Sequence, residues 1–568
     1  PMRKLFIALL SALLCLLLSV SALAADGLSA FQETQTYQPG MFSDVKAGSW
    51  YEAGVRAVYT RGIMNGTGGK AFAPSQTITW AQAAAIAARI HAACGGAEIA
   101  AAEGQWYEPY LAYAAQAKLL PSTCPEGAAA ASTTITRQEL AGLFANVLRA
   151  DDLPPLNDQS IPDLAAVDAE FRAAVQRMYA AGVFTGKDGG RFDPKGSATR
   201  AEIAVIVSRL LLPGQRVSHD SRINTAMSAQ MGNYYQGGLA VQSGDTVYYG
   251  FRDDRKADSG ECYGLIARKT DGSTKTVFTS NRAPDSLYLS EDGAFYFLCW
   301  EKLLRYDPAA DKLEEVYAAK GKIDSFQIYD GRLYVLENYS GDSNYSDQWR
   351  YRFGCVENGQ FRSLMDGITF NQVINMDRFH IFNNKAYFLF GDSTEPSSSG
   401  SGYVFYNYAL WSLDLETGKK GRAVDIDDFD MSEIAFDGAT AYALEWDKDD
   451  TVPLRIVRFS LLQPELREVM ATLPMEAKEL YPLLFANGGD LYYLSSDAHR
   501  LWHIGSNGDV TVSAQLPWGD RTFEYATVTP QGVLFHDVSS LRMNDSSVSR
   551  VRLPDGSVVN YLDVLSLN

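Results

Sequence analysis

The sequence predicts a chain with two structurally different parts, an all-α region of three helical repeats and an all-β propeller of about seven four-stranded blades. Two observations carry this prediction. Residues 40–212 repeat an apolar helix, a Gly-rich turn, a Phe-x-Pro step and a second helix at a period of ~60 residues. Residues 236–568 instead repeat a turn followed by an aromatic strand, which is typical of β-hairpins.

The start of the chain predicts export. Within residues 1–24, Arg3 and Lys4 precede an apolar run and a small-residue exit, which is typical of a cleaved secretory signal peptide. A membrane anchor is the alternative, but the apolar run is shorter than the ~20 residues that span a bilayer. A lipid on Cys15 is disfavoured because the bulky Leu14 precedes it. We expect a secreted protein with no membrane span after cleavage.

The charge of the chain argues against a nucleic-acid partner. The formal net charge is −18, and loss of the two positive charges of Arg3 and Lys4 takes it to −20. An acidic surface repels nucleic acid and offers no basic stripe to anionic membranes.

The cysteines fit no zinc motif. Five remain after loss of Cys15, and they are scattered along the chain. Cys94 and Cys124 lie in neighbouring repeats, so a disulfide between them is one prediction and two thiols are the alternative.

The helical region divides into three repeats and a polar linker. Gly66 and Gly186 follow the first helix of a repeat, and we expect them to adopt positive φ in tight turns. The predicted bounds are 40–95, 100–150 and 158–212 for the repeats, 213–235 for the linker and 236–568 for the propeller.

Each second helix opens with Thr-x-x-Glu or Thr-x-x-Gln. This spacing predicts a capping box, in which the Thr side chain and the side chain three residues later satisfy amides at the helix start. The pairs are Thr79 with Gln82, Thr136 with Glu139, and Thr199 with Glu202.

Capping does not explain Arg137 and Arg200, which follow the capping threonines. A cation at a helix N-terminus opposes the macrodipole. It is favourable there if free amides and a bidentate guanidinium converge on one anion, so we predict an anion site. A solvated arginine is the alternative. Trp80 stands in this position in the first repeat, where it is able to stack on a sugar but not to replace the charge.

The segment Thr199-Arg200-Ala201-Glu202 and the repeated Phe-x-Pro steps resemble the S-layer homology family. The resemblance covers residues 40–212. It implies three modules in a three-pronged helical bundle, attached noncovalently to secondary cell-wall polysaccharide with acidic or pyruvylated sugars. It also implies a location at the cell wall of a Gram-positive-type bacterium, and it assigns polymer binding to Arg200 and Arg137.

The same resemblance points to further binding residues. Asp44 and Asp163 match the early Asp that lines the polymer groove, although an Asx turn is an equally good use of each. Trp50 and Trp106 are candidate sugar platforms, although packing against helices is the favoured interpretation of both.

Seven turns, each followed by an aromatic strand, predict the propeller. A second turn lies between successive copies, and two hairpins in 40–50 residues make one four-stranded blade. Tandem sandwiches are the alternative, but their repeats are near ~100 residues long. The pattern resembles divergent bacterial propellers found beside S-layer homology modules. The copies lie at 244–249, 292–297, 330–335, 384–389, 437–442, 489–493 and 531–535.

The propeller sequence offers no catalytic residue. Its histidines have no ligand spacing, and no Gly-x-Ser-x-Gly elbow is present. We predict no cofactor. Acidic stretches at 425–430 and 447–450 are calcium candidates, but both lack the Gly and Glu of an EF-hand, so solvated loops are favoured.

Two insertions offer recognition surfaces. Tyr339, Tyr345 and Trp349 lie among amides and hydroxyls in one of them, which suits binding of an unknown glycan or protein ligand. Residues 403–408 after the other are interpreted as a strand. We expect a wall-anchored protein whose propeller serves recognition or scaffolding. A polysaccharide-degrading enzyme on the propeller face and a self-assembling surface lattice are the alternatives.

Overall fold

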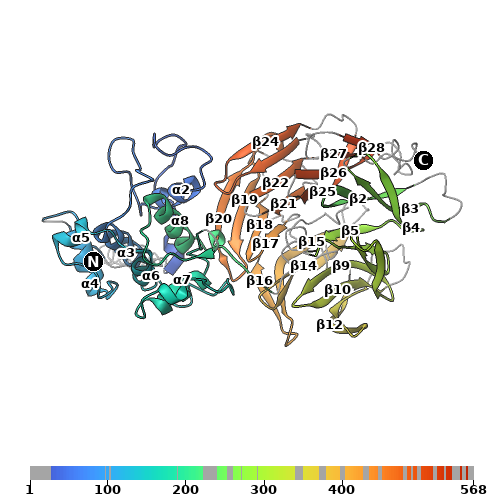
Figure 1. The fold of residues 1–568 in the computed structure, drawn as a ribbon, viewed down its shortest axis with the longest axis horizontal. Helices are drawn as coiled ribbons and strands as arrows, with labels where there is room; N and C mark the ends of the chain where they lie inside the picture. The colour runs from blue at the N-terminus through green and yellow to red at the C-terminus, as the bar shows by residue number, and fades with distance from the viewer. Residues whose placement is uncertain are drawn as a thin grey trace, which may run out of the picture. The chain divides into compact units, whose positions relative to one another are not determined.

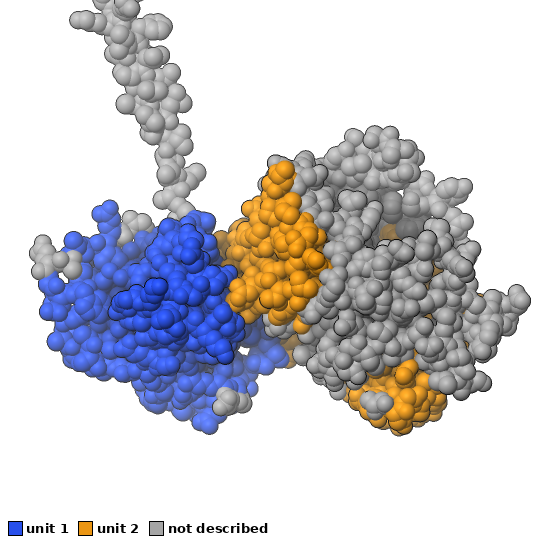
Figure 2. All heavy atoms as spheres, turned by 90° about the horizontal axis from the view of Figure 1, so that it is seen from above, with its two compact units in different colours: residues 1–219 blue, residues 220–568 orange. Residues whose placement is uncertain are grey.

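The chain forms two compact units, residues 1–219 and 220–568, which Figure 2 colours separately. A computed structural model describes residues 27–560 with gaps, so the predicted signal peptide lies outside the described residues. None of the described helices is long and apolar enough to cross a membrane. The gaps are 96–97, 102–103, 188–189, 222–239, 253–259, 270, 291, 340–349, 370–378, 397–402, 426–433, 446–450, 478–482, 488–489, 496–499, 516–520, 530–531, 540–549 and 553–557.

The helices α2 to α8 of unit 1 (Figure 1) follow the three predicted repeats along the chain, and the middle repeat has a short extra helix. Three short 3-10 helices, η1 (Gly27–Ala30), η2 (Leu164–Ala166) and η4 (Pro213–Gln215), lie outside the repeat helices. The repeat helices are α2 (Glu52–Thr60) and α3 (Trp80–Gly95), then α4 (Glu108–Gln116), α5 (Ala128–Ser132) and α6 (Arg137–Phe144), then α7 (Arg172–Ala180) and α8 (Arg200–Leu211).

Helices pair across repeats rather than within them. The second helix of each repeat packs on the first helix of another: α3 on α4, α6 on α7, and α8 back on α2. Glycine permits two of these approaches, since a Cβ on Gly54 of α2 would lie 2.9 Å from Val205 and one on Gly142 of α6 would lie 2.8 Å from Phe171. The third repeat is therefore joined to the first.

The starts of the three second helices also meet. Isolated β-bridges join Thr77 to Thr199, Thr79 to Thr134, and Thr136 to Ser197. Each bridge links residues just before the second helix of two different repeats. The predicted capping threonines therefore lie together at the junction of the repeats.

The expected role of two glycines is wrong. Positive φ belongs to Gly62 and Gly182, at 68° and 69°, and neither Gly66 nor Gly186 is among the described residues with positive φ. Those two are needed for close approach instead. A Cβ on Gly66 would lie 2.8 Å from the carbonyl oxygen of Ala71, and one on Gly186 would meet backbone at 2.3 Å.

Unit 2 is a β-propeller with six four-stranded antiparallel blades, each in simple chain order. Blade 1 is β1 (Ala240–Ser243), β2 (Thr246–Arg252), β3 (Tyr263–Lys269) and β4 (Thr274–Ser280); blade 2 is β5 (Asp285–Leu289), β6 (Phe295–Cys299), β7 (Lys302–Asp307) and β8 (Lys312–Ala318). Blade 3 is β9 (Lys322–Tyr329), β10 (Arg332–Asn338), β11 (Arg350–Glu357) and β12 (Gln360–Thr369); blade 4 is β13 (His380–Phe382), β14 (Lys385–Pro396), β15 (Tyr403–Asp414) and β16 (Lys420–Asp425). Blade 5 is β17 (Ile434–Asp437), β18 (Thr440–Glu445), β19 (Arg455–Ser460) and β20 (Gln463–Thr472), followed by η8 (Met475–Ala477); blade 6 is β21 (Leu483–Asn487), β22 (Asp490–Ser495), β23 (Arg500–Ile504) and β24 (Val510–Gln515).

The predicted count of seven blades is not matched. The last repeat forms two separate two-stranded sheets, β25 (Arg521–Thr529) with β26 (Gly532–Ser539), and β27 (Arg550–Arg552) with β28 (Val558–Asn560). A turn followed by an aromatic strand reports one hairpin. It does not show whether two hairpins are joined by hydrogen bonds into one four-stranded blade. The number of turns therefore exceeds the number of four-stranded sheets.

The core of unit 2 lies between neighbouring blades. Tyr248 and Leu265 of blade 1 pack with Phe295 and Phe297 of blade 2 in one buried cluster. The recurring aromatic of the sequence lies near the start of each second strand, paired with the first strand of its blade, at the third position in five blades and at the second position of β6 in blade 2. The six tyrosines there are Tyr248, Tyr296, Tyr334, Tyr387, Tyr442 and Tyr492.

Candidate functional site

Capping boxes form at the start of all three second helices. At α6 the Thr136 hydroxyl accepts from the amide of Glu139, whose carboxylate accepts from the Thr136 amide. Thr199 and Glu202 repeat this arrangement at α8. At α3 the side chain of Gln82 accepts from the Thr79 amide at 3.1 Å, and the Gln82 amide donates to the Thr79 hydroxyl at 3.4 Å.

The first helical amides are occupied by protein. The Arg200 amide donates to the carbonyl of Gln76 at 2.7 Å, and the next amide donates to that of Pro74 at 2.9 Å. At α6 the Arg137 amide donates to Gly196 at 2.8 Å. The expectation that free amides converge with the guanidinium on an anion is therefore wrong, because a neighbouring repeat already uses these donors.

Each guanidinium binds the carbonyls of another repeat. Arg137, in the second repeat, donates from Nε to Phe192 at 2.8 Å and from Nη2 to Thr185 at 3.3 Å, both in the third repeat. Its guanidinium lies 5.2 Å from the Phe192 ring centre. The side chain is buried, so the alternative of a solvated arginine is wrong here.

Arg200 makes the equivalent contacts from the third repeat to the first. Its Nε donates to Phe72 at 2.8 Å and its Nη2 to Asn65 at 2.9 Å. The Phe72 ring centre lies 4.8 Å from the guanidinium. Both arginines thus connect one repeat to the loop before another second helix, and their Nη1 atoms are not used in these contacts.

The two early aspartates shape the loops that receive the arginines. Asp44 accepts from the amides of Phe72 and Ala73, both at 2.8 Å. Asp163 accepts from Phe192 at 2.7 Å and from Asp193 at 2.8 Å. Burial raises the pKa of the Asp163 carboxyl, but the two amides outweigh it and leave that pKa below its usual value.

The middle residue of each Phe-x-Pro step is left-handed. Ala73 has φ 59° and Asp193 has φ 58°. Asx residues tolerate this conformation better than alanine does. The loops therefore share a backbone, but the third repeat adds a carboxylate where the first has a methyl group.

This difference changes the charge around the two arginines. Burial lowers the pKa of both guanidinium groups. For Arg137 the opposing carboxylates are Glu202, Asp193 and Asp163, whereas for Arg200 the opposing carboxylate is Asp44. Two of the three carboxylates near Arg137, Asp193 and Glu202, also pair with Lys187 at 3.2 and 3.6 Å. Arg137 therefore lies in a cluster of charges of both signs, whereas Arg200 is opposed by Asp44.

Trp80 is not available to a ligand. The residue is 1% exposed, and its amide donates to the carbonyl of Thr133 at 3.0 Å. The prediction that Trp80 stacks on a sugar is therefore wrong. The Trp80 indole packs in the interior, and the Trp80 backbone amide forms the hydrogen bond that links the first repeat to the second.

Trp50 and Trp106 are both exposed, at 65% and 50% of their surface. Each ring stands edge-on to the tyrosine that follows it, with an interplanar angle of 87° in both cases. The interpretation that they pack against helices is wrong. The third repeat has Glu170 in this place, before Phe171 at the N-cap of α7.

Cys94 and Cys124 are thiols rather than a disulfide. The Cys94 sulfur donates to the carbonyl of Gly27 at 3.5 Å, and the Cys124 sulfur donates to that of Pro125 at 3.6 Å. The predicted disulfide is wrong because each sulfur lies against a different part of the chain.

The predicted propeller loop is described only at its first residue. Tyr339 is 38% exposed, and its hydroxyl donates to Asp366 at 3.1 Å. Tyr345 and Trp349 lie outside the described residues, as do most of the acidic stretch 425–430 and residues 447–450. Among the side chains that the structure describes, no three carboxylate, imidazole or thiol groups gather as metal ligands would.

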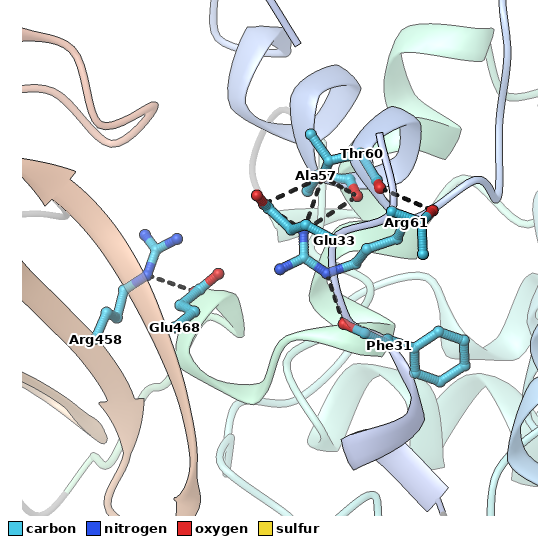
Figure 3. Close-up of polar contacts among 8 residues, drawn as sticks. Phe31, Glu33, Ala57, Thr60, Arg61, Arg458 and Glu468 are labelled. Carbon is cyan, nitrogen blue, oxygen red and sulfur yellow. Dashed lines mark hydrogen bonds and ion pairs between the residues drawn. The ribbon is translucent and has the colours of Figure 1, made fainter. Parts of the chain in front are cut away.

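Sequence reasoning missed two arginines that Figure 3 shows. In unit 1, Arg61 donates from Nε to Phe31 at 3.1 Å and from Nη1 to Glu33 at 3.3 Å, which ties the segment before the first repeat to the end of α2. In unit 2, Arg458 donates to Glu468 at 2.8 Å across the β19–β20 ladder. Neither residue belongs to a motif: the packing of unit 1 brings Arg61 to its partners, and the register of β19 with β20 brings Arg458 to Glu468.

The fold and the helix junction together define a protein of helical repeats followed by a propeller. The sequence profile of the S-layer homology domain family matches residues 42–84 and 160–204, within the first and third repeats. The chain thus carries S-layer homology domains at two sites, and such domains indicate a protein associated with the cell surface or cell wall.

The other likenesses are partial. An endoglucanase of Bacillus sp. (strain KSM-635) is 25% identical over 195 residues, which are 32% of this chain and 20% of that protein. The acylaminoacyl peptidase of Pyrococcus horikoshii matches with TM-score 0.39 and 12% identity, over 58% of this chain and 52% of that one. For the β-propeller domain of the Trilobed protease from Pyrococcus furiosus, the TM-score is 0.36 and the identity 11%, over 57% and 96% of the two chains. The chain spans about a fifth of the endoglucanase and about half of the peptidase.

Proposed function

We propose that the protein is secreted and attached noncovalently to acidic, pyruvylated cell-wall polysaccharide of a Gram-positive-type bacterium through three S-layer homology modules, with the propeller serving recognition or scaffolding. The middle repeat acts as the third module, since its capping box and Arg137 match those of the third repeat. The three repeats form the three-pronged bundle that the resemblance implies.

The environment of Arg200 is the observation that carries this proposal. Two of its guanidinium nitrogens are held by backbone carbonyls, which fixes the orientation of the remaining donors. A pre-oriented guanidinium binds a carboxylate with little loss of side-chain entropy. Arg137 lies in a cluster of carboxylates and Lys187, whereas Asp44 is the one carboxylate that opposes Arg200, so the Arg200 guanidinium is the one that accommodates an added anionic sugar.

The exposed tryptophans support sugar binding in the same unit. Exposed aromatic side chains offer a flat apolar face beside a polar edge, which suits contact with a ligand that is itself amphipathic. Trp50 and Trp106 occupy equivalent positions, just before α2 and α4, with equivalent edge-on contacts to tyrosine. Each presents a flat apolar surface to a pyranose ring.

Sedimentation of the full chain with purified walls tests the attachment. Arg200→Ala is expected to weaken binding about tenfold or more, which corresponds to ~1.4 kcal/mol. Arg177→Ala is the matched control, because Arg177 also donates to two backbone carbonyls of unit 1, those of Ala145 and Arg149. If both variants bind walls as the parent does, the proposed attachment site is wrong.

A further inference from the structure

The link between blades 2 and 3 contacts both the turn that holds Trp300 and the backbone of Tyr339. The amide of Ala319, in the link from blade 2 to blade 3, donates to the carbonyl of Glu301 at 2.8 Å, and that of Ile323 donates to Trp300 at 2.9 Å. A Cβ on Gly321 of the same link would lie 2.8 Å from the Cα of Tyr339. The two aromatic residues therefore flank one link, on two adjacent blades.

Trp300 has a backbone conformation that suits a different residue. It occupies the two-residue turn between β6 and β7, where Cys299 pairs with Lys302, and its φ is 58°. Glycine or asparagine is preferred at positive φ in such turns, and a bulky side chain there is strained. Among the described residues with positive φ, Trp300 is the only aromatic. Strain of this kind gathers at functional sites.

The Arg282 side chain lies over the strained indole, and the backbone of Arg282 is held by hydrogen bonds at both its amide and its carbonyl. Its guanidinium carbon is 4.1 Å from the Trp300 ring centre. The Arg282 amide donates to the Ser280 hydroxyl at 3.1 Å, and its carbonyl accepts from the Cys299 thiol at 3.6 Å. The side chain stacks on an aromatic face, as guanidinium groups do, and this leaves its planar edge for a ligand.

The Arg282 charge has no acidic partner among the side chains that the structure describes. This is unexpected in a chain with 68 acidic and 50 basic residues. Lys275 of blade 1 and Lys302 and Arg305 of blade 2 are all paired with carboxylates. An exposed and oriented guanidinium without a carboxylate is ready to accept one from outside.

Tyr339 adds a second flat surface. Its hydroxyl is held by Asp366 at 3.1 Å, and the guanidinium of Arg352 lies 5.6 Å from the ring centre. These contacts hold the ring while more than a third of the residue stays exposed. Amphipathic aromatic rings of this kind pack against one face of a ligand while their polar ends stay hydrated.

We infer that Arg282, Trp300 and Tyr339 form a binding site on blades 2 and 3 for a carboxylate-bearing saccharide. The guanidinium edge donates two parallel hydrogen bonds to the carboxylate, and the aromatic rings contact the apolar face of the sugar. This assigns a ligand class to the recognition role proposed for the propeller and rests on that role.

Calorimetric titration of the full chain with a uronic-acid tetrasaccharide tests the site, with a neutral glucose tetrasaccharide alongside. We expect the acidic probe to bind and the neutral one not to bind. Arg282→Ala is expected to weaken binding at least about tenfold, and Arg282→Lys to restore it only in part, because lysine lacks the planar fork.

Trp300→Gly separates a binding role from a structural one. Glycine relieves the strained φ, so the melting temperature of unit 2 should stay the same or rise while binding is lost. Asn358→Gly is the matched control, since Asn358 has φ 52° in the β11–β12 turn. It should be equally stable and bind normally.

Three outcomes would overturn the site: equal binding of the neutral probe, parental affinity in Trp300→Gly, or binding of a peptide carboxylate in place of the acidic saccharide. Arg200→Ala should leave this affinity unchanged. Binding of the soluble probe therefore measures the propeller site alone, independently of whether unit 1 attaches the protein to walls.

Discussion

Arg200 donates from Nε to the carbonyl of Phe72 at 2.8 Å, although 128 residues separate them. The contact joins the start of the last repeat to the loop of the first. Arg137 makes the same contact to Phe192 one repeat earlier in the chain. The residue expected to hold a ligand is therefore also a structural connection between repeats.

Removing the Arg200 connection should destabilise unit 1. Arg200→Ala loses two hydrogen bonds from a charged group and leaves the Phe72 and Asn65 carbonyls without a donor. We expect a loss of about 3 kcal/mol in the free energy of unfolding. Denaturant titration followed by far-ultraviolet circular dichroism measures it, because helix occurs chiefly in unit 1. An unchanged midpoint would mean that the contact adds nothing to stability.

The tryptophans of unit 1 should respond in opposite ways. Trp50→Ala with Trp106→Ala removes exposed rings, so wall binding should fall while the free energy of unfolding changes by less than about 0.5 kcal/mol. Trp80→Ala empties a buried position and should cost about 3–5 kcal/mol. Wall sedimentation and denaturant titration on the same samples check both. Loss of stability in the double variant would show that the exposed rings are structural.

Much of the repeat architecture could be predicted from the sequence because the motifs that specify it are short and local. A capping box lies within four residues, and the glycine-rich turns and aromatic strands are equally compact. The contacts of Arg137 and Arg200 could not be predicted, because their partners belong to another repeat and depend on how the three repeats pack together. The same reason hid the exposure of Trp50 and the burial of Trp80, which are set by packing between repeats rather than by either residue's own helix.

The propeller shows the same limit. Hairpins were visible in the sequence, but whether β26 and β27 join into one blade depends on a ladder that leaves no sequence signal. Only one of the two aromatic residues proposed for the site on blades 2 and 3 could be singled out from the sequence. Tyr339 stood in a polar loop, whereas Trp300 gains meaning only from its positive φ and from Arg282, which is 18 residues away in sequence.

His380 should make unit 2 sensitive to acid. Its Nε2 lies 2.8 Å from the Gly438 carbonyl oxygen, so Nε2–H donates there, and its ring stacks on Phe436. Burial lowers the pKa of His380 to about 4, although the bond to Gly438 and the charge of Asp220 oppose the shift. The unfolded chain then binds the proton first, near pH 6.5.

The stability that depends on neutral His380 is therefore complete above about pH 6.5 and falls as the pH drops towards 4, by about 3 kcal/mol in total. His380→Phe keeps the stacking and has no proton to gain. Its free energy of unfolding should be lower at neutral pH but should lose less between pH 6.5 and 4 than the parent does. Parallel losses in the two proteins would contradict the buried neutral state.

The central claim is that Arg200, which is opposed by the Asp44 carboxylate, is the principal anion-binding residue. Ala73→Asp tests it most directly, because Asp193 already occupies the equivalent left-handed position and shows that the backbone tolerates the change. The measurement is the affinity of the full chain for purified walls, with the free energy of unfolding as control. The account predicts at least a ~10-fold loss of affinity with no loss of stability. Wall binding as tight as that of the parent would contradict it.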